Sequence, residues 1–183
     1  MKYKSIIDKI EANIYTRDDL ARIRKNALLK VLNGDQDAQV VVDAIDRAVP
    51  TDTRIIFMGF CLGGDVGDRL DNEWKERRVC TFHHHASKHQ AERFNEIWVG
   101  ELIVLKKRQQ IGRTMRLHGH GRAIGVKYDV DGRRYLEMDW SSQSRIIEVP
   151  LMGVNATVEP KSIGAVEREM PPEFFHWLNE PSS

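Results

Sequence analysis

Apolar residues recur every three or four positions over the first fifty residues, which is the spacing of one buried helix face. The pattern predicts a first helix over residues 3–14 and a second that starts after Thr16 and stops at Asn33-Gly34. Thr16 and Asp19 occupy the two positions of a capping box, with aspartate in place of glutamate. A third helix is predicted between residue 35 and Pro50, so we expect a helical head.

After Pro50 the hydrophobic period changes to that of β-structure. A buried strand is predicted at residues 54–58, and Asp131-Gly132 indicates a hairpin further along the chain. The remaining predicted strands span residues 79–82, 101–105, 115–118, 122–128, 134–140 and 146–149. The predicted helices of this region span residues 68–77, 86–95 and the segment after Pro171-Pro172.

Many short strands at close spacing favour a barrel or a strongly curved sheet, because closure hides the strand edges. The sequence therefore predicts an α+β protein with a helical head over residues 1–50 and a β-barrel domain with a C-terminal helix over residues 51–183. The head is a candidate dimerisation module. Its alternative is a helix-turn-helix that places Arg22, Arg24 and Lys25 on DNA.

The composition is that of a globular protein, with 41% hydrophobic and 30% charged residues. Asp8 and Glu11 interrupt the first apolar stretch, so we expect neither a signal sequence nor a membrane helix there, and no membrane partner. Cys61 and Cys80 are the only cysteines in the sequence, which favours free thiols in a reducing cytoplasm.

The net charge of +1 argues against a protein that coats DNA by charge alone. The charges are nevertheless unevenly distributed. Residues 106–145 contain ten lysines and arginines against four acidic residues, whereas residues 146–183 contain two against six. The basic segment is either a solvated face that is balanced elsewhere in the fold or a surface that faces phosphates.

Three segments carry a further pattern: Trp98-Val-Gly-Glu-Leu-Ile-Val-Leu105, Gly119-His-Gly-Arg-Ala-Ile-Gly125 and Tyr135-Leu-Glu-Met-Asp-Trp140. Together they resemble the PUA-like superfamily, particularly its EVE and ASCH branches. In those folds a Gly-Asp step opens an aliphatic strand, a later strand has the form Gly-x-Gly-x-Val, and the next returns to a tryptophan. Here Glu101 replaces the aspartate and Ala123-Ile124 replaces the valine, and the similarity spans about residues 54–150.

The resemblance implies a PUA-like β-barrel that, as in EVE and YTH relatives, holds a nucleobase, often a modified one, in an aromatic-walled pocket. A flipped base needs aromatic faces to replace its lost stacking and polar groups to read its edge. The candidate pocket residues are Phe60, Asp65, Trp74, Phe82 and Trp98, although each aromatic among them can instead belong to the core. The candidate phosphate-binding residues are Lys106, Lys107, Arg108, Arg113, Arg116 and Arg122.

The predicted function is therefore nucleic-acid binding, to DNA or RNA, with no cofactor. The resemblance implies a setting in prokaryotic defence or RNA handling. A reader without a nuclease of its own needs an effector protein, and a homodimer would present two readers at once. A protein interaction module that binds no nucleic acid is left open as an alternative.

A metal-dependent nuclease is the enzymatic alternative. Six of the seven histidines fall in two groups, His83, His84, His85 and His89 and then His118 and His120. His85 and His89 have the spacing of a metal pair on one helix, and Asp65, Asp68 and Glu73 could assist hydrolysis. The pair lacks the glutamate of a zinc protease, and no strand carries the Glu-x-Lys pattern of a nuclease core. Because no motif is complete, no catalytic residue is predicted.

Overall fold

The structure is a computed structural model that describes residues 2–49, 53–62, 67–82, 87–110, 112–142 and 145–180. Asp65 and His85, two residues of the sequence-based candidate sites, lie outside the described residues. The chain divides into two compact units, Met1–Pro50 and Thr51–Ser183. None of the described helices is long and apolar enough to cross a membrane.

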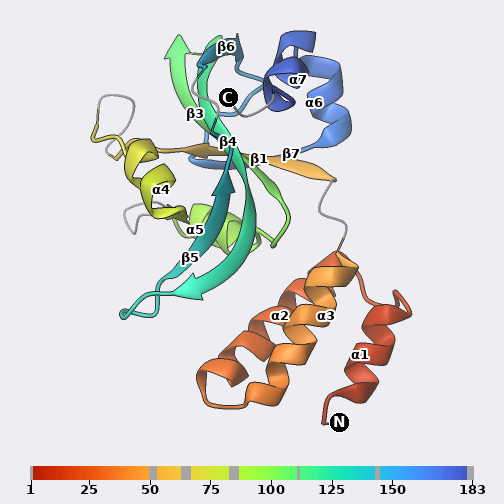
Figure 1. Ribbon diagram of the computed structural model, residues 1–183. Helices are drawn as coiled ribbons and strands as arrows, with labels where there is room; N and C mark the ends of the chain where they lie inside the picture. Colours follow the sequence, from red (N-terminus) through yellow and green to blue (C-terminus); the bar gives the residue numbers. More distant parts are fainter. Residues whose placement is uncertain are drawn as a thin grey trace. The chain divides into compact units, whose positions relative to one another are not determined.

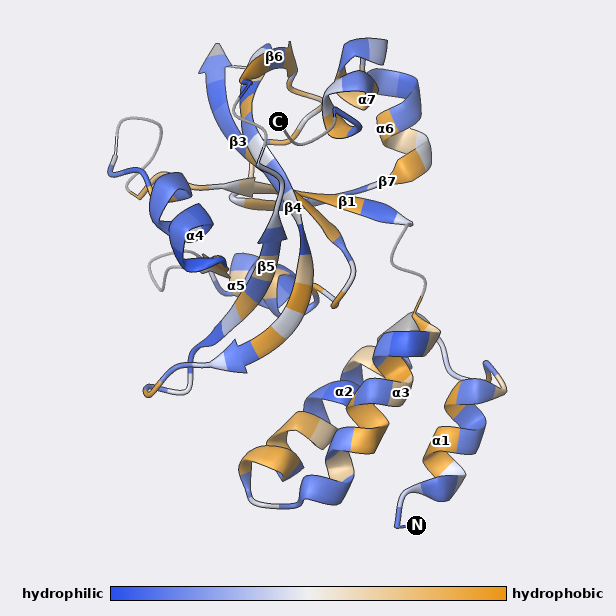
Figure 2. Cartoon of the chain, viewed as in Figure 1, coloured by the Kyte–Doolittle hydropathy of each residue, from blue (hydrophilic) through white to orange (hydrophobic). Residues whose placement is uncertain are grey.

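Unit 1 contains three α-helices, α1 (Lys4–Glu11), α2 (Arg17–Leu32) and α3 (Gln39–Ala48), with the short 3-10 helix η1 (Gln36–Ala38) before α3 (Figure 1). Apolar and polar bands alternate along these helices (Figure 2). The apolar faces meet in a small core of Ile10, Leu20, Ala27, Ala38, Val41, Val42, Ala44 and Ile45. The helical spacing of apolar residues in the sequence thus matches the spacing of buried residues in this unit.

The start of α2 confirms the predicted capping box. The Asp19 N–H donates to the Thr16 hydroxyl oxygen over 3.2 Å, and the Thr16 N–H donates to the Asp19 carboxylate over 3.3 Å. After α2, Gly34 has a φ of 92°, which an L-residue with a side chain rarely adopts. Local sequence signals therefore set both ends of this helix.

Arg24 is buried within unit 1. Its guanidinium makes two hydrogen bonds to the Asp46 carboxylate on α3, of 2.7 and 3.1 Å, and the residue is 5% exposed. A side chain held in this way cannot reach DNA, so the helix-turn-helix alternative is wrong for Arg24. The reason is that an arginine within an apolar stripe lies in the core when a carboxylate is available to pair with it.

Unit 2 is built on a seven-stranded mixed sheet in the described residues (Figure 1). The strands are β1 (Arg54–Gly59), β2 (Val79–Thr81), β3 (Leu102–Gln110), β4 (Thr114–Tyr128), β5 (Arg134–Trp140), β6 (Ile147–Pro150) and β7 (Val158–Ser162). The helices are α4 (Asp71–Arg77), α5 (Lys88–Asn95), α6 (Ile163–Glu169) and α7 (Pro172–Leu178). The predicted α+β class is therefore confirmed.

The strand order β2-β5-β4-β3-β1-β7, with β6 paired to β4 alone, leaves β2, β6 and β7 as edges among the described strands. The sheet is not closed, so the predicted barrel is not confirmed. Strand β1 runs parallel to β3, and the other pairs are antiparallel. Two predicted strands are a single long β4, because β4 bends through register shifts instead of ending.

Strand β1 separates two hydrophobic cores. Ile56 and Met58 pack with Trp74 of α4 and Phe94 of α5, whereas the alternate residues Ile55 and Phe57 pack with apolar residues of α6 and α7. Successive side chains of a strand point to opposite faces, so helices cover the sheet on both sides. This is why β1 reads as a continuous apolar run in the sequence.

The partners of β4 change in the middle of the strand. Its residues 114–117 pair with β6, and pairing with β5 begins at Gly121. On the other edge, Leu105 of β3 is opposite Gly119 and Lys106 is opposite Leu117, so His118 is the extra residue of a β-bulge. Residues 118–120 therefore lie at a gap between β5 and β6, and bulges often redirect side chains next to functional sites.

Candidate functional site

Lys75 of α4 reaches residues 118–120 of β4, which lie between the end of the pairing with β6 and the start of the pairing with β5. This stretch is called the gap in β4 below. Its ammonium group donates a hydrogen bond of 2.6 Å to the His118 carbonyl oxygen. A Cβ atom on Gly119 would lie 2.8 Å from Cε and Nζ of Lys75, so the missing side chain leaves room for this lysine. The Ser141 N–H donates to the His120 carbonyl oxygen over 2.9 Å. The carbonyl oxygens of His118 and His120 are thus hydrogen-bonded by a side chain of α4 and by the main chain just after β5.

His118 is 7% exposed and lies against residues that precede and begin α4. Its Nδ1 is 3.2 Å from an Nη atom of Arg69, and its ring meets the Phe60 ring edge-on with centroids 4.8 Å apart. Arg69 also makes two hydrogen bonds, of 3.0 and 2.6 Å, to the buried Asp71 carboxylate. The guanidinium lies over the Phe60 ring, 5.4 Å from its centroid, so one arginine orients both His118 and Asp71.

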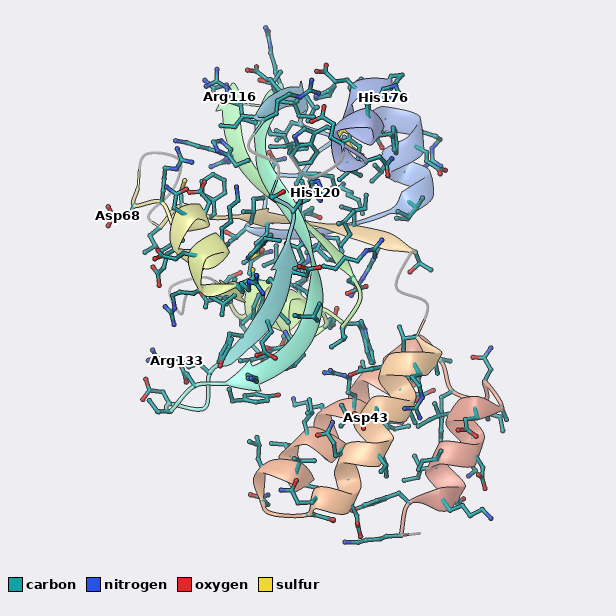
Figure 3. The ribbon with its side chains drawn as sticks, in the orientation of Figure 1. Asp43, Asp68, Arg116, His120, Arg133 and His176 are labelled. Carbon is teal, nitrogen blue, oxygen red and sulfur yellow. The ribbon has the colours of Figure 1, made fainter. Side chains whose placement is uncertain are left out.

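His120 is two residues further along β4 and is 9% exposed. Its ring packs edge-on against Trp177 of α7, with centroids 4.8 Å apart, and the Trp177 indole N–H donates to the Arg145 carbonyl oxygen over 2.8 Å. Figure 3 shows His120 in the middle of β4, near the crossing of the strands. The Nε2 atoms of both His118 and His120 are buried and have no hydrogen-bond partner among the described residues. Such groups are rare in folded proteins and need an explanation.

Burial, assisted by nearby cationic side chains, keeps both histidines neutral at pH 7. Burial, together with the charges of Arg69, Lys75 and Lys107, lowers the pKa of His118 to about 4 against the opposing charge of Asp71. Burial, followed by the Lys75 charge, also lowers the pKa of His120, and Arg122 adds to this effect. A neutral imidazole offers one donor and one acceptor. The site therefore presents hydrogen-bonding groups without adding charge of its own.

Among the sequence-based pocket residues that the structure describes, Phe60 has a ring contact with His118, and Phe60 is itself 1% exposed and part of the core cluster that contains Trp74. Trp74 is 1% exposed, and its indole N–H donates to the Thr81 hydroxyl over 3.0 Å. Trp98 is 2% exposed, and Phe82 is half-buried with its ring stacked on Phe94 at 5.5 Å. Trp74 belongs to one core cluster, Phe82 packs against the same cluster, and Trp98 is buried, so none of these three residues offers an open aromatic face in the described structure.

The predicted phosphate-binding residues separate into groups. Lys106 is a correction: it is 4% exposed, and its ammonium donates to the Val154 carbonyl oxygen over 2.8 Å, so a phosphate cannot reach it. The cause is strand alternation, which turns Lys106 to the α6–α7 face. Lys107 and Arg122 are near enough to lower the pKa values of the histidines. Arg122 also donates to the Gly100 carbonyl oxygen over 2.8 Å.

Arg108, Arg113 and Arg116 are exposed along the turn-proximal ends of β3 and β4. Arg116 is 3.3 Å from the Glu148 carboxylate of β6, an exposed ion pair (Figure 3). Exposed pairs of this kind contribute little to stability and can open to accept a phosphate. These arginines extend the basic segment away from the histidines along the same two strands.

No group of three or more histidine, cysteine, aspartate or glutamate side chains arranged to hold a metal ion is found in the part of the chain that the structure describes. His89 is exposed on α5, Asp68 is exposed before α4, and Glu73 pairs with Arg77 on the same helix. Asp65 and His85 lie outside the described ranges. The described residues therefore give no support to the nuclease alternative.

The sequence did not identify Arg69, Asp71 or Lys75 as site residues. They are charged residues at the start of a predicted helix, where such residues are common. In the structure, Arg69 and Lys75 hydrogen-bond to His118 at the bulge in β4. The available signal was the segment His118-Gly-His-Gly121, in which histidines and glycines alternate along a strand. Glycines in a strand mark a bulge or a close approach of another group, and here they mark both.

Comparison of the chain with protein-family models, curated proteins and solved structures finds no match. The resemblance to the PUA-like superfamily is therefore a prediction, and the arguments for function rest on the residues of this chain.

A first prediction concerns stability and pH. The pKa of His118 is near 6.5 in the unfolded chain and about 4 in the folded one, so the folded state binds fewer protons between these values. The contribution to stability is complete above pH 6.5 and is lost as the pH falls to about 4. Urea unfolding at pH 7 and pH 4.5 is expected to show about 2–3 kcal/mol of stability lost through His118.

The matched comparison uses two histidine variants. His118→Gln should lose much less stability over this pH range than the wild-type protein, whereas the exposed His89→Gln on α5 should lose as much as the wild type. Equal pH dependence in all three proteins would contradict a neutral, buried His118.

Proposed function

We propose that the protein binds nucleic acid at the gap in β4, as a PUA-like reader that takes a base, flipped or modified, beside His118. The observation that carries the proposal is the pair of buried histidines with unpartnered Nε2 atoms among cationic side chains. The Gly119–Gly125 segment, which carries the sequence resemblance, is the part of β4 that contains His120 and borders His118. The sequence pattern and the unpartnered groups thus support the same location.

The charges around the gap suit a phosphodiester backbone. Among the described residues, the charges of Arg69, Lys75, Lys107 and Arg122 lower the pKa values of the two histidines, and the charge of Asp71 opposes them at His118. Protein contacts to phosphate fix the register of a nucleic acid, whereas contacts to base edges select its sequence. We assign Lys107 and Arg122 to phosphates because they flank the histidines, and the histidine side of the gap to the base.

Dimerisation through unit 1 and an effector partner are separate proposals. Among the described residues, Leu29, Leu32 and Val40 are large apolar side chains that are 39–58% exposed near the turn between α2 and α3. Apolar side chains exposed close together are a common feature of interaction surfaces. The sedimentation coefficient of the full chain would decide between a monomer and a homodimer.

The test is a binding titration by fluorescence anisotropy. Short single strands and duplexes of DNA and RNA, unmodified and with methylated or hydroxymethylated bases, are titrated with protein between about 50 and 200 mM salt. Replacement of both Lys107 and Arg122 by alanine should weaken binding to all sequences alike. It should also reduce the slope of log K against log salt by roughly 1.4–1.8, since two phosphate contacts are lost.

The matched control is Arg133→Ala. Arg133 is exposed at the turn between β4 and β5 and lies apart from His120 (Figure 3), with its own partner Asp131 at 3.4 Å. This variant should keep the wild-type salt slope. Absence of binding by the wild-type protein at low salt, or an equal change of slope in the control, would argue against the proposed function.

A further inference from the structure

The chemical character of the group that His118 contacts can be derived from its hydrogen bonds. The guanidinium of Arg69 has N–H donors and no acceptor, and it lies 3.2 Å from Nδ1 of His118. Nδ1 must therefore accept this hydrogen bond with its lone pair. In a neutral imidazole the proton is then on Nε2.

The alternative tautomer would need Asp71 to accept a hydrogen bond from Nδ1. The Oδ2 atom of Asp71 is 3.9 Å from Nδ1, which is too long for a hydrogen bond. Both carboxylate oxygens are in addition engaged by Arg69, at 3.0 and 2.6 Å. Asp71 thus fixes the arginine, and the arginine fixes the tautomer of the histidine.

The Nε2–H of His118 is consequently a buried donor without an acceptor. No protein group among the described residues accepts a hydrogen bond from this donor, and a ligand atom with a lone pair would satisfy it. Arg69 and Lys75, which hydrogen-bond to Nδ1 and to the carbonyl oxygen of His118, are donors as well, and the nearby Asp71 carboxylate is already paired with Arg69. An amino group at this position would face donors, whereas a carbonyl oxygen would satisfy them.

We propose that His118 donates a hydrogen bond from Nε2 to the carbonyl oxygen at C6 of a purine or C4 of a pyrimidine. The site then prefers guanine, thymine and uracil to adenine and cytosine, which carry an amino group at that position. This inference rests on the proposed nucleic-acid binding and specifies the ligand of that same site. Sites that hydrogen-bond a particular substrate group reject analogues without it more strongly than apolar pockets reject a change of size.

The test compares oligonucleotides that differ at one base. The wild-type protein should bind a strand with guanine at least tenfold more tightly than the same strand with 2-aminopurine, which lacks the carbonyl, and a strand with uracil at least tenfold more tightly than one with cytosine. His118→Phe retains a ring against Phe60 but has no donor, and it should lose this discrimination. His118→Gln retains an N–H donor and should recover part of it.

A second measurement does not depend on the variants folding. The nitrogen chemical shifts of ¹⁵N-labelled histidine in the free protein should show His118 with a protonated Nε2 and an unprotonated Nδ1. A proton on Nδ1 would overturn the inference. Equal affinity of the wild-type protein for carbonyl and amino bases would also overturn the inference. So would an equal loss of affinity for all bases in His118→Phe. In both cases nucleic-acid binding itself would be retained. If no strand binds at all, the proposed function fails first.

Discussion

Replacement of Glu101 by glutamine is expected to destabilise unit 2 by about 3 kcal/mol. Glu101 is fully buried at the start of β3, where its carboxylate accepts hydrogen bonds from Nε and Nη2 of Arg54 and, over 2.8 Å, from the Trp98 N–H. A glutamine has one acceptor oxygen and presents an amide N–H to the guanidinium. One buried charge is then left without its counter-ion, which costs more than the intact pair contributes.

The measurement is urea unfolding followed by tryptophan fluorescence. The four tryptophans of the chain, Trp74, Trp98, Trp140 and Trp177, all belong to unit 2, so the signal reports on that unit alone. The matched control is Glu73→Gln on α4, because Glu73 and its partner Arg77 are largely exposed. The control should lose less than about 0.5 kcal/mol. Similar losses in both variants would contradict the role assigned to Glu101.

Replacement of Gly121 by alanine is the second substitution with a large expected effect, about 3 kcal/mol. A Cβ atom at this position would lie 2.6 Å from the Asp139 carbonyl oxygen and 2.9 Å from Cα of Trp140. Both are main-chain atoms of β5, which cannot move without breaking the pairing of the two strands. Because Gly121 follows His120, the same substitution should also weaken any ligand binding at the gap.

Gly125→Ala provides the control on the same strand. There the new Cβ would meet the carboxylate end of Glu137, a side chain that forms an exposed ion pair with Lys127 and can rotate away. We expect a loss below about 1 kcal/mol, measured by the same unfolding curves. If both alanine variants were equally stable, close packing of β4 against β5 would not be the reason for a glycine at position 121.

Short-range features of the fold could be predicted from the sequence. The capping box at Thr16 and Asp19 depends on residues three apart, and the alternate burial along β5 and β6 depends on a period of two. Strand β7 was missed because its sequence, Val158-Glu-Pro-Lys-Ser162, has no apolar alternation. A proline is tolerated there because β7 lies at the edge of the sheet.

The candidate site could be predicted only in part. The strand that contains the two histidines could be predicted, and so could the nearby Lys107 and Arg122. These residues lie close together in the sequence or on paired strands. The contact between Arg69 and His118 joins residues 49 positions apart through a bulge. The alternating glycines of His118-Gly-His-Gly121 indicate a bulge, but the register of the two strands within the whole sheet decides which side chains it brings to His118.

The most direct test of the central claim is a map of amide chemical shifts in ¹⁵N-labelled protein as the tightest-binding oligonucleotide is added. The account predicts that the largest changes fall on residues 117–122 of β4 and on residues 69–75, which contain Arg69, Asp71 and Lys75. Changes confined to the helices of unit 1, or to the exposed turn between β4 and β5, would contradict the claim that the gap in β4 holds the ligand.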